Sequence, residues 1–284
     1  MNMKTLTYAM AAAAAFALCA CSGVDAKAKK PDREKQIAVQ SYTCYKMNLT
    51  DMFKMFKELG VKNVEICGGK LGGDYPNVGV GPNMKPEHLQ YLKDIAKKNG
   101  ITLISYGVCN PKDEKGIKAV CEFAKSLGLK FVSTECDPKT FPIWEKYCGE
   151  YGIKMCIHNH ARRDKNPDYK FWDYNWVAKE IAPYKNIGVC ADNGAWECSG
   201  LNSVEGAKVL ADKIFIVHLK DQKKFNVRNS PAVVYGTGEV DVAAFLKQLD
   251  KQGFDGYLII EHGNDPIEAK RDIISRDMDF IRKN

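Results

Sequence analysis

Four apolar runs in the second half of the chain each end on a side chain of a type that binds metal ions. The runs are Ile153–Ile157, Ile187–Ala191, Ile214–Val217 and Tyr257–Ile260, and the residues at their ends are His158, Asp192, His218 and Glu261. A polar or charged group at the end of a buried strand is costly unless it is paired or bound to a metal. Imidazole and carboxylate ligands together suit Mn²⁺, Zn²⁺, Co²⁺ or Fe²⁺, so the pattern predicts a site for one divalent metal ion.

The spacing of these residues indicates how the fold brings them together. They lie about 26 to 43 residues apart, which is the period of βα units whose strands are parallel and adjacent in one sheet. Eight such apolar runs occur in all, the first four being Ile37–Tyr42, Val61–Ile66, Ile101–Tyr106 and Leu129–Thr134. Most are short and rich in β-branched residues, as expected for strands that are buried on both faces.

Amphipathic segments separate the apolar runs. Those over 51–59, 86–99 and 111–127 each precede a glycine that fits a left-handed helix end. The alternation predicts an α/β fold, a single (β/α)₈ TIM barrel domain over residues 36–284. A doubly wound open sheet is the alternative, but no Gly-rich phosphate turn follows Gln40 at the end of the first run.

The first residues of the chain read as an export signal. A basic start and an apolar segment over 5–18 lead into Leu18-Cys19-Ala20-Cys21, which resembles a bacterial lipobox. We therefore predict a signal peptide with lipobox over residues 1–21, lipidation of Cys21 and a flexible linker over residues 22–35. The protein would be an exported lipoprotein that touches the membrane only through this anchor. Cleavage after Ala26, which would give a soluble periplasmic protein, is the alternative.

Charge and cysteine content exclude other classes of protein. The formal net charge is +7, but the basic residues are scattered and no aromatic residues interleave with them, so we expect no nucleic-acid partner. Nine of the eleven cysteines lie outside the signal region, and no CxxC pair occurs among them. Because nine is an odd number, at least one thiol is free or is paired with another chain. A homo-oligomer therefore stays one of the alternatives for the assembly of this protein.

Several motifs coincide with the strand ends and carry a family resemblance. They are Gln40-Ser-Tyr, Ile157-His-Asn-His, Asp192-Asn-Gly, His218-Leu-Lys-Asp, Gly236-Thr-Gly-Glu-Val-Asp and Ile260-Glu. With them the chain resembles the xylose isomerase-like TIM barrel superfamily, the sugar phosphate isomerases/epimerases, from about Gln36 to Ile281. The resemblance implies one divalent metal held after strands five to eight by Glu, Asp, His and Glu.

Three of these positions match the family in residue type, namely Asp192, His218 and Glu261. At the strand-five position His158 stands in place of the glutamate, and three interpretations stay open: a metal ligand, a general base, or a neutral histidine hydrogen-bonded in the barrel mouth. Glu135, at the end of strand four, is a candidate for the missing carboxylate ligand. The resemblance implies that Glu261 is both a metal ligand and the catalytic partner of the strand-five residue.

Five further residues are candidates for the site, and three of them have two alternative roles. Lys220 shares a side of its strand with His218. It is either a catalytic acid or oxyanion stabiliser with a depressed pKa, or the partner of a carboxylate or substrate hydroxyl. Glu65 contacts the substrate or pairs with a lysine, and Trp196 stacks on a sugar ring or anchors a loop. His160 and Gln40 are expected to bind the substrate.

These residues predict a metal-dependent sugar isomerase or epimerase that removes a proton α to a carbonyl. Export favours an unphosphorylated sugar or sugar derivative as the small-molecule substrate, because sugar phosphates are cytoplasmic. One alternative is a lyase or dehydratase that eliminates from a keto-sugar or keto-glycoside at the same site. The other is a non-catalytic sugar-binding lipoprotein. A metal-dependent endonuclease of the same fold would need more than the five histidines of this chain.

Overall fold

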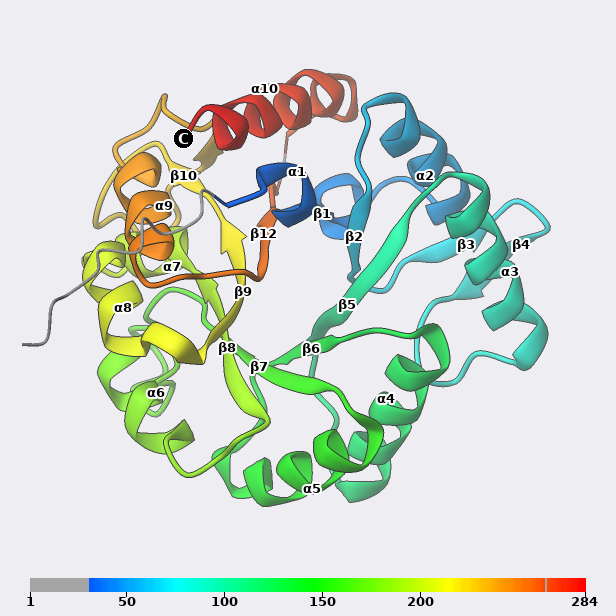
Figure 1. The fold of residues 1–284 in the computed structure, drawn as a ribbon, viewed down its shortest axis with the longest axis horizontal. Helices are drawn as coiled ribbons and strands as arrows, with labels where there is room; N and C mark the ends of the chain where they lie inside the picture. Colours follow the sequence, from blue (N-terminus) through cyan, green and yellow to red (C-terminus); the bar gives the residue numbers. More distant parts are fainter. Residues whose placement is uncertain (1–30, 264) are drawn as a thin grey trace, which may run out of the picture.

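The fold is a closed barrel of eight parallel strands, seen in a computed structural model that describes residues 31–263 and 265–284 (Figure 1). The barrel strands are β1 (Ile37–Gln40), β2 (Asn63–Ile66), β5 (Thr102–Cys109), β6 (Phe131–Thr134), β7 (Lys154–His158), β8 (Ile187–Asp192), β9 (Ile214–Leu219) and β12 (Tyr257–Ile260). The first strand pairs with both β2 and β12, which closes the sheet. The predicted TIM barrel is confirmed, whereas the predicted signal peptide and Cys21 lie outside the described residues.

Helices surround the barrel as an outer ring, except for the short α1, which lies inside this ring beside β1 and β12 (Figure 1). The helices are α1 (Arg33–Gln36), α2 (Leu49–Glu58), α3 (Pro86–Lys98), α4 (Glu114–Leu127), α5 (Phe141–Tyr151), α6 (Tyr174–Ile181), α7 (Asn193–Cys198), α8 (Ser203–Leu210), α9 (Val242–Lys251) and α10 (Lys270–Lys283). Their apolar faces are buried in one large core, as Phe53 and Phe56 of α2 illustrate. The glycines after α2, α3 and α4 have φ values of 78°, 68° and 71°, so the predicted left-handed helix ends are confirmed.

Alternation along the strands explains where the polar side chains lie. A small apolar cluster fills the barrel, formed by Ala38, Ile104, Cys156, Cys190, Ile216 and Ile259. Residues two apart on a strand point to the same face. His158, Asp192, His218 and Glu261 each come two residues after a member of this cluster. They therefore point inward, one layer above it, at the C-terminal mouth of the barrel.

Two segments near the N-terminus differ from the prediction. The first strand ends at Gln40 rather than Tyr42, because Ser41–Cys44 form a 3₁₀ helix, η1. The helix α1 also overlaps the predicted linker 22–35, over residues 33–35. Arg33 in α1 is buried, and its guanidinium lies 2.8 Å from the Asp250 carboxylate. A buried arginine needs such a partner, so the linker prediction is wrong for residues 33–35.

The loops that leave the C-terminal ends of the strands carry two short antiparallel ribbons. One joins β3 (Lys70–Gly72) and β4 (Tyr75–Gly79), and the other joins β10 (Asp221–Gln222) and β11 (Ala232–Val233). The remaining 3₁₀ helices are η2 (Pro138–Thr140), η3 (Ala211–Lys213) and η4 (Ile267–Ala269). Within the described ranges, no helix has both the length and the apolar character needed to cross a membrane.

Candidate active site

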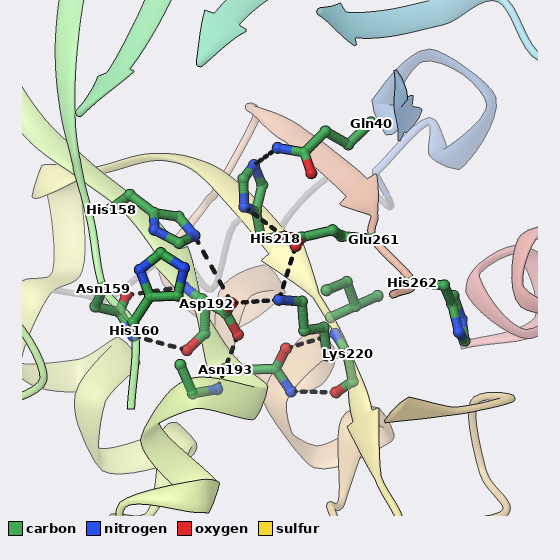
Figure 2. A network of polar contacts seen from close by, with 12 residues as sticks. Gln40, His158, Asn159, His160, Asp192, Asn193, His218, Lys220, Glu261 and His262 are labelled. Atoms are coloured by element: carbon green, nitrogen blue, oxygen red, sulfur yellow. Dashed lines mark hydrogen bonds and ion pairs between the residues drawn. The ribbon is translucent and has the colours of Figure 1, made fainter. Parts of the chain in front are cut away.

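Four of the predicted site residues converge at the barrel mouth (Figure 2). Ligand-type atoms of His158, Asp192, His218 and Glu261 all lie within 4.8 Å of one another, although they come from β7, β8, β9 and the residue after β12. We call these residues the four-residue cluster. His158 and Glu261 also line a cavity of about 790 Å³ that opens above the cluster.

The cluster has the chemistry of a metal site. Both ring nitrogens of His158, Nδ1 of His218 and Oε2 of Glu261 are buried and have no hydrogen-bond partner among the described residues. The last two atoms face each other at 2.8 Å. Buried polar atoms without partners are rare and costly. A divalent cation held by two imidazoles and two carboxylates would bind one nitrogen of His158, Nδ1 of His218 and Oε2 of Glu261, so the residues present fit such an ion.

His218 is held in one orientation by Glu65 on the far side of the barrel. Nε2 of His218 lies 2.7 Å from a carboxylate oxygen of Glu65. The same carboxylate accepts hydrogen bonds from Gln40, at 2.6 Å, and from Ser105. A carboxylate on one ring nitrogen fixes the proton there and leaves the other nitrogen free to ligate a metal. Both readings of Glu65 are therefore corrected: the side chain is fully buried and pairs with His218, neither with substrate nor with a lysine.

Lys220 bridges the two carboxylates of the cluster. Its Nζ lies 2.8 Å from Asp192 Oδ2 and 3.0 Å from Glu261 Oε1. Burial would lower the pKa of Lys220, but the two carboxylates outweigh it and raise this pKa above its ordinary range. The prediction that Lys220 has a depressed pKa is thus wrong. The alternative, in which Lys220 pairs with a carboxylate, is the one observed.

His158 lies between two groups of polar side chains. Its Nε2 is 3.7 Å from Asp192 Oδ2, and its Nδ1 is 3.7 Å from Glu135 Oε1. Burial lowers the pKa of His158, which favours the neutral imidazole that ligates metals or accepts a proton. Neither ring nitrogen of His158 has a protein hydrogen-bond partner among the described residues, and both are therefore available to a metal ion, a substrate or a water molecule.

Glu135 belongs to a second group rather than to the four-residue cluster. Its carboxylate accepts hydrogen bonds from His160 and Tyr169, and from Arg163 at 3.1 Å. Burial would raise the pKa of Glu135, but His158 and His160 lower it below its ordinary value, so it is ionised. With His158 and His160 it forms a second set of residues whose ligand-type atoms lie within 4.8 Å of one another, so the proposal that Glu135 replaces the strand-five carboxylate stays a prediction. An ionised Glu135 fixes the proton of His160 on Nδ1.

Two further predicted substrate-binding residues line the cavity and one does not. Gln40 and His160 are both part of its wall. Trp196 is 1% exposed and packs edge-on against Tyr174, with ring centroids 5.7 Å apart. The prediction that Trp196 stacks on a sugar is therefore wrong. The alternative is observed, in which Trp196 is buried and anchors a loop.

Two asparagines that sequence reasoning did not single out connect the strand ends. The Asn159 side chain makes two hydrogen bonds with the backbone of Asp192, at 2.9 and 3.0 Å. The Asn193 side chain does the same with the backbone of Lys220, at 2.8 Å each. Each asparagine directly follows a cluster residue, and this is the signal in the sequence that could have identified them. They fix the spacing between neighbouring strands where the site is built.

Comparison with known proteins agrees with this architecture. Residues 53–284 match the family described as xylose isomerase-like TIM barrel. The inosose dehydratase of Clostridium perfringens is 26% identical over 134 residues, which are 42% of this chain and 44% of that protein. The chain thus spans less than half the length of this curated relative.

Solved structures of similar fold cover most of the chain. IolI protein with a bound zinc atom has a TM-score of 0.68 at 19% identity, covering 87% of this chain and 98% of that one. The 3-keto-D-glucoside 4-epimerase YcjR from E. coli has a TM-score of 0.66 at 17% identity, covering 88% and 99%. At these identities the likeness establishes the fold.

Proposed function

Because the chain belongs to the xylose isomerase-like TIM barrel family, we propose that it is a divalent-metal-dependent isomerase or epimerase of an unphosphorylated sugar or sugar derivative. The observation that carries the proposal is the four-residue cluster, with ligand-type atoms within 4.8 Å of one another at the base of a cavity. The family's isomerases, epimerases and dehydratases make an enzyme the first expectation for such a site.

Each residue of the four-residue cluster has a proposed role in the reaction. Asp192, His218, Glu261 and His158 would hold the ion, which when bound polarises the substrate carbonyl and stabilises the negative charge that develops on its oxygen. Glu261 and His158 come from β12 and β7, with β9 and β8 between them in the barrel. One can remove the proton α to the carbonyl while the other returns a proton from the opposite side, which gives epimerisation. Lys220 keeps the Glu261 carboxylate oriented.

The charges around the cavity support an unphosphorylated substrate. Among the described lining residues Lys220 is the one lysine or arginine, and two carboxylates already neutralise it. A phosphate group is usually bound by free cationic side chains or by several backbone N–H groups. The predicted export of the protein favours the same class of substrate.

Elimination is the second candidate reaction. It begins with the same proton abstraction and is followed by loss of a β-substituent, and the Clostridium relative is an inosose dehydratase. The observation that favours it is His158 at the strand-five position, because a neutral imidazole replaces one of the two carboxylates on which the family's epimerisation depends.

Deuterium exchange tests the shared first step of both reactions. The purified protein, loaded with Mn²⁺ or Zn²⁺, is incubated in deuterated water with a panel of free sugars and 3-keto sugars. We expect deuterium at the carbon next to the carbonyl, detected by NMR, whichever product forms afterwards. Glu261→Gln should abolish this exchange, and Glu58→Gln on the surface of α2 is the matched control. A metal-loaded protein that binds a sugar but exchanges no proton would instead be a sugar-binding protein.

A further inference from the structure

Tyr42 lines the cavity and stacks with Tyr45, and neither tyrosine belongs to the four-residue cluster. Tyr42 and Tyr45 are 39% and 46% exposed, and their ring centroids are 5.2 Å apart with an interplanar angle of 18°. The other exposed large apolar side chains of the described residues are Val209, Phe225 and Val227. Of this set, Tyr42 is the member that lines the cavity. A pair of stacked aromatic rings beside a cavity offers a flat apolar face to a ligand.

The backbone beneath Tyr42 is fixed by buried polar neighbours. Gln40 is bound to Glu65, and the Ser41 hydroxyl accepts a hydrogen bond from the Cys67 N–H at 2.7 Å. The Thr43 hydroxyl contacts the Ile260 carbonyl at 3.3 Å and accepts from the His262 N–H at 3.1 Å. Residues 40, 41 and 43 are held by these hydrogen bonds, Tyr42 between them lines the cavity, and the ring of Tyr45 stacks on that of Tyr42. The Tyr42–Tyr45 pair, which we call the platform, therefore lies on a backbone that is already fixed before a ligand binds.

The cavity extends well beyond the cluster toward this platform. Its volume of about 790 Å³ lies in the upper part of the range for sites that bind drug-sized ligands. Tyr42 lines the cavity on the side of β1. The loops after β9 and β12 add Asn229, Ser230 and Asp265. An aromatic face beside polar groups suits a sugar or phenyl ring, whose flat apolar face stacks while its hydroxyls find hydrogen-bond partners.

We infer that Tyr42, backed by Tyr45, forms a second-ring subsite, so that the substrate class is a glycoside rather than a free monosaccharide. The reacting sugar lies at the four-residue cluster, and the ring attached to it stacks on Tyr42. The inference rests on the proposed function in placing the reacting sugar at the cluster. Tyr42 is the binding residue of this subsite, and Tyr45 is a positioning residue that holds the Tyr42 ring plane.

Binding of matched glycosides tests the subsite without requiring turnover. Methyl and phenyl β-glucosides, and methyl and phenyl β-galactosides, are titrated into the zinc-loaded protein, and their dissociation constants are measured by ligand-observed NMR. We expect at least one phenyl glycoside to bind about tenfold more tightly than its methyl counterpart, the size of effect that aromatic stacking produces. Tyr42→Ala should remove this preference and leave methyl glycoside binding unchanged, whereas Tyr42→Trp should retain it. Phe225→Ala, an exposed aromatic residue outside the cavity wall, is the matched control.

Each contrary outcome bears on one of the two proposals. Equal binding of the phenyl and methyl glycosides, or binding of none of them, would overturn the second-ring subsite. So would an equal loss of both in Tyr42→Ala, because Tyr42 would then contact the reacting sugar itself. A phenyl preference that depends on Tyr42, together with no proton exchange on any sugar, would leave the subsite standing and overturn the proposed isomerase or lyase activity.

Discussion

At the scale of single residues, the site depends on partners that hold the cluster residues in place. Glu65 binds Nε2 of His218 at 2.7 Å, which leaves Nδ1 pointing at Glu261. Such carboxylate–histidine pairs raise the basicity of a ligating imidazole and fix its ring, and their loss usually weakens metal binding. The effect of Glu65 should therefore appear in metal affinity before it appears in the fold.

Glu65→Gln tests this role. Glutamine keeps the size of the side chain but loses the negative charge, so we expect the affinity for Zn²⁺ to fall by about 10–100-fold. Competition with a chromophoric chelator measures the change, and circular dichroism verifies the fold. Glu239→Gln, which alters an exposed ion pair with Lys224, should leave the affinity unchanged. Unaltered zinc affinity in Glu65→Gln would mean that His218 needs no such partner.

His158 is the residue whose role differs most from the family pattern. Both its nitrogens are buried, unpartnered and beside the cluster, so we expect His158→Ala to lower metal occupancy and activity together. Elemental analysis of the purified variant and the proton-exchange assay measure the two quantities, and His88→Ala on α3 is the control. If occupancy is retained while turnover falls by about 10²–10⁴-fold, His158 is a base and not a ligand.

At the scale of elements, the strand ends are tied together by side chains that bind backbone groups. Asp221, at the start of β10, accepts hydrogen bonds from the backbone N–H groups of Gly236, Thr237, Gly238 and Val240. This contact closes the long loop after β9, which also contributes Asn229–Ala232 to the cavity wall. The loop passes so close to Asp221 that one of its residues has no room for a side chain.

Gly238→Ala tests this close approach. A Cβ at this position would lie 2.2 Å from Asp221 Oδ1 and 2.3 Å from the Gln222 carbonyl oxygen. Forced overpacking of this kind costs about 1–3 kcal/mol in the free energy of unfolding, so the Tm should fall by several degrees. Gly79→Ala is the matched control, because a Cβ there meets nothing within 4 Å. Equal melting temperatures for the two variants would show that the loop relaxes without cost.

The elements were largely predictable because each barrel strand is buried on both faces. Such strands leave continuous apolar runs such as Ile187–Ala191, and a period of two places His158 or Asp192 above the apolar interior. The early end of β1 was not predictable, because it depends on hydrogen bonds of Ser41 and Thr43 to residues far along the chain. The same holds for Glu65, whose partner His218 is 153 residues away. Contacts across a closed barrel leave no local pattern in the sequence.

At the scale of the whole molecule, the protein carries many cysteines and no disulfide among its described residues. Nine thiols are free, and most are buried in the core. Burial raises the pKa of Cys67 to about 11 and that of Cys190 to about 12, so little reactive thiolate forms near neutral pH. These thiols behave as small apolar side chains, which is compatible with the export that we propose.

We propose that the protein is exported and carries a lipid at Cys21. The helix α1 begins at Arg33, and the predicted lipobox cysteine lies twelve residues earlier in the sequence. A lipid chain contributes about 0.8 kcal/mol per buried CH₂, and more than one chain gives stable anchoring. We therefore expect the full-length protein to sediment with membranes, and Cys21→Ser to release it into the soluble fraction or leave it unprocessed. Cys19→Ser, two residues before Cys21, is the matched control and should stay membrane-bound. A wild-type protein already found in the soluble periplasmic fraction would contradict lipidation and favour cleavage after Ala26.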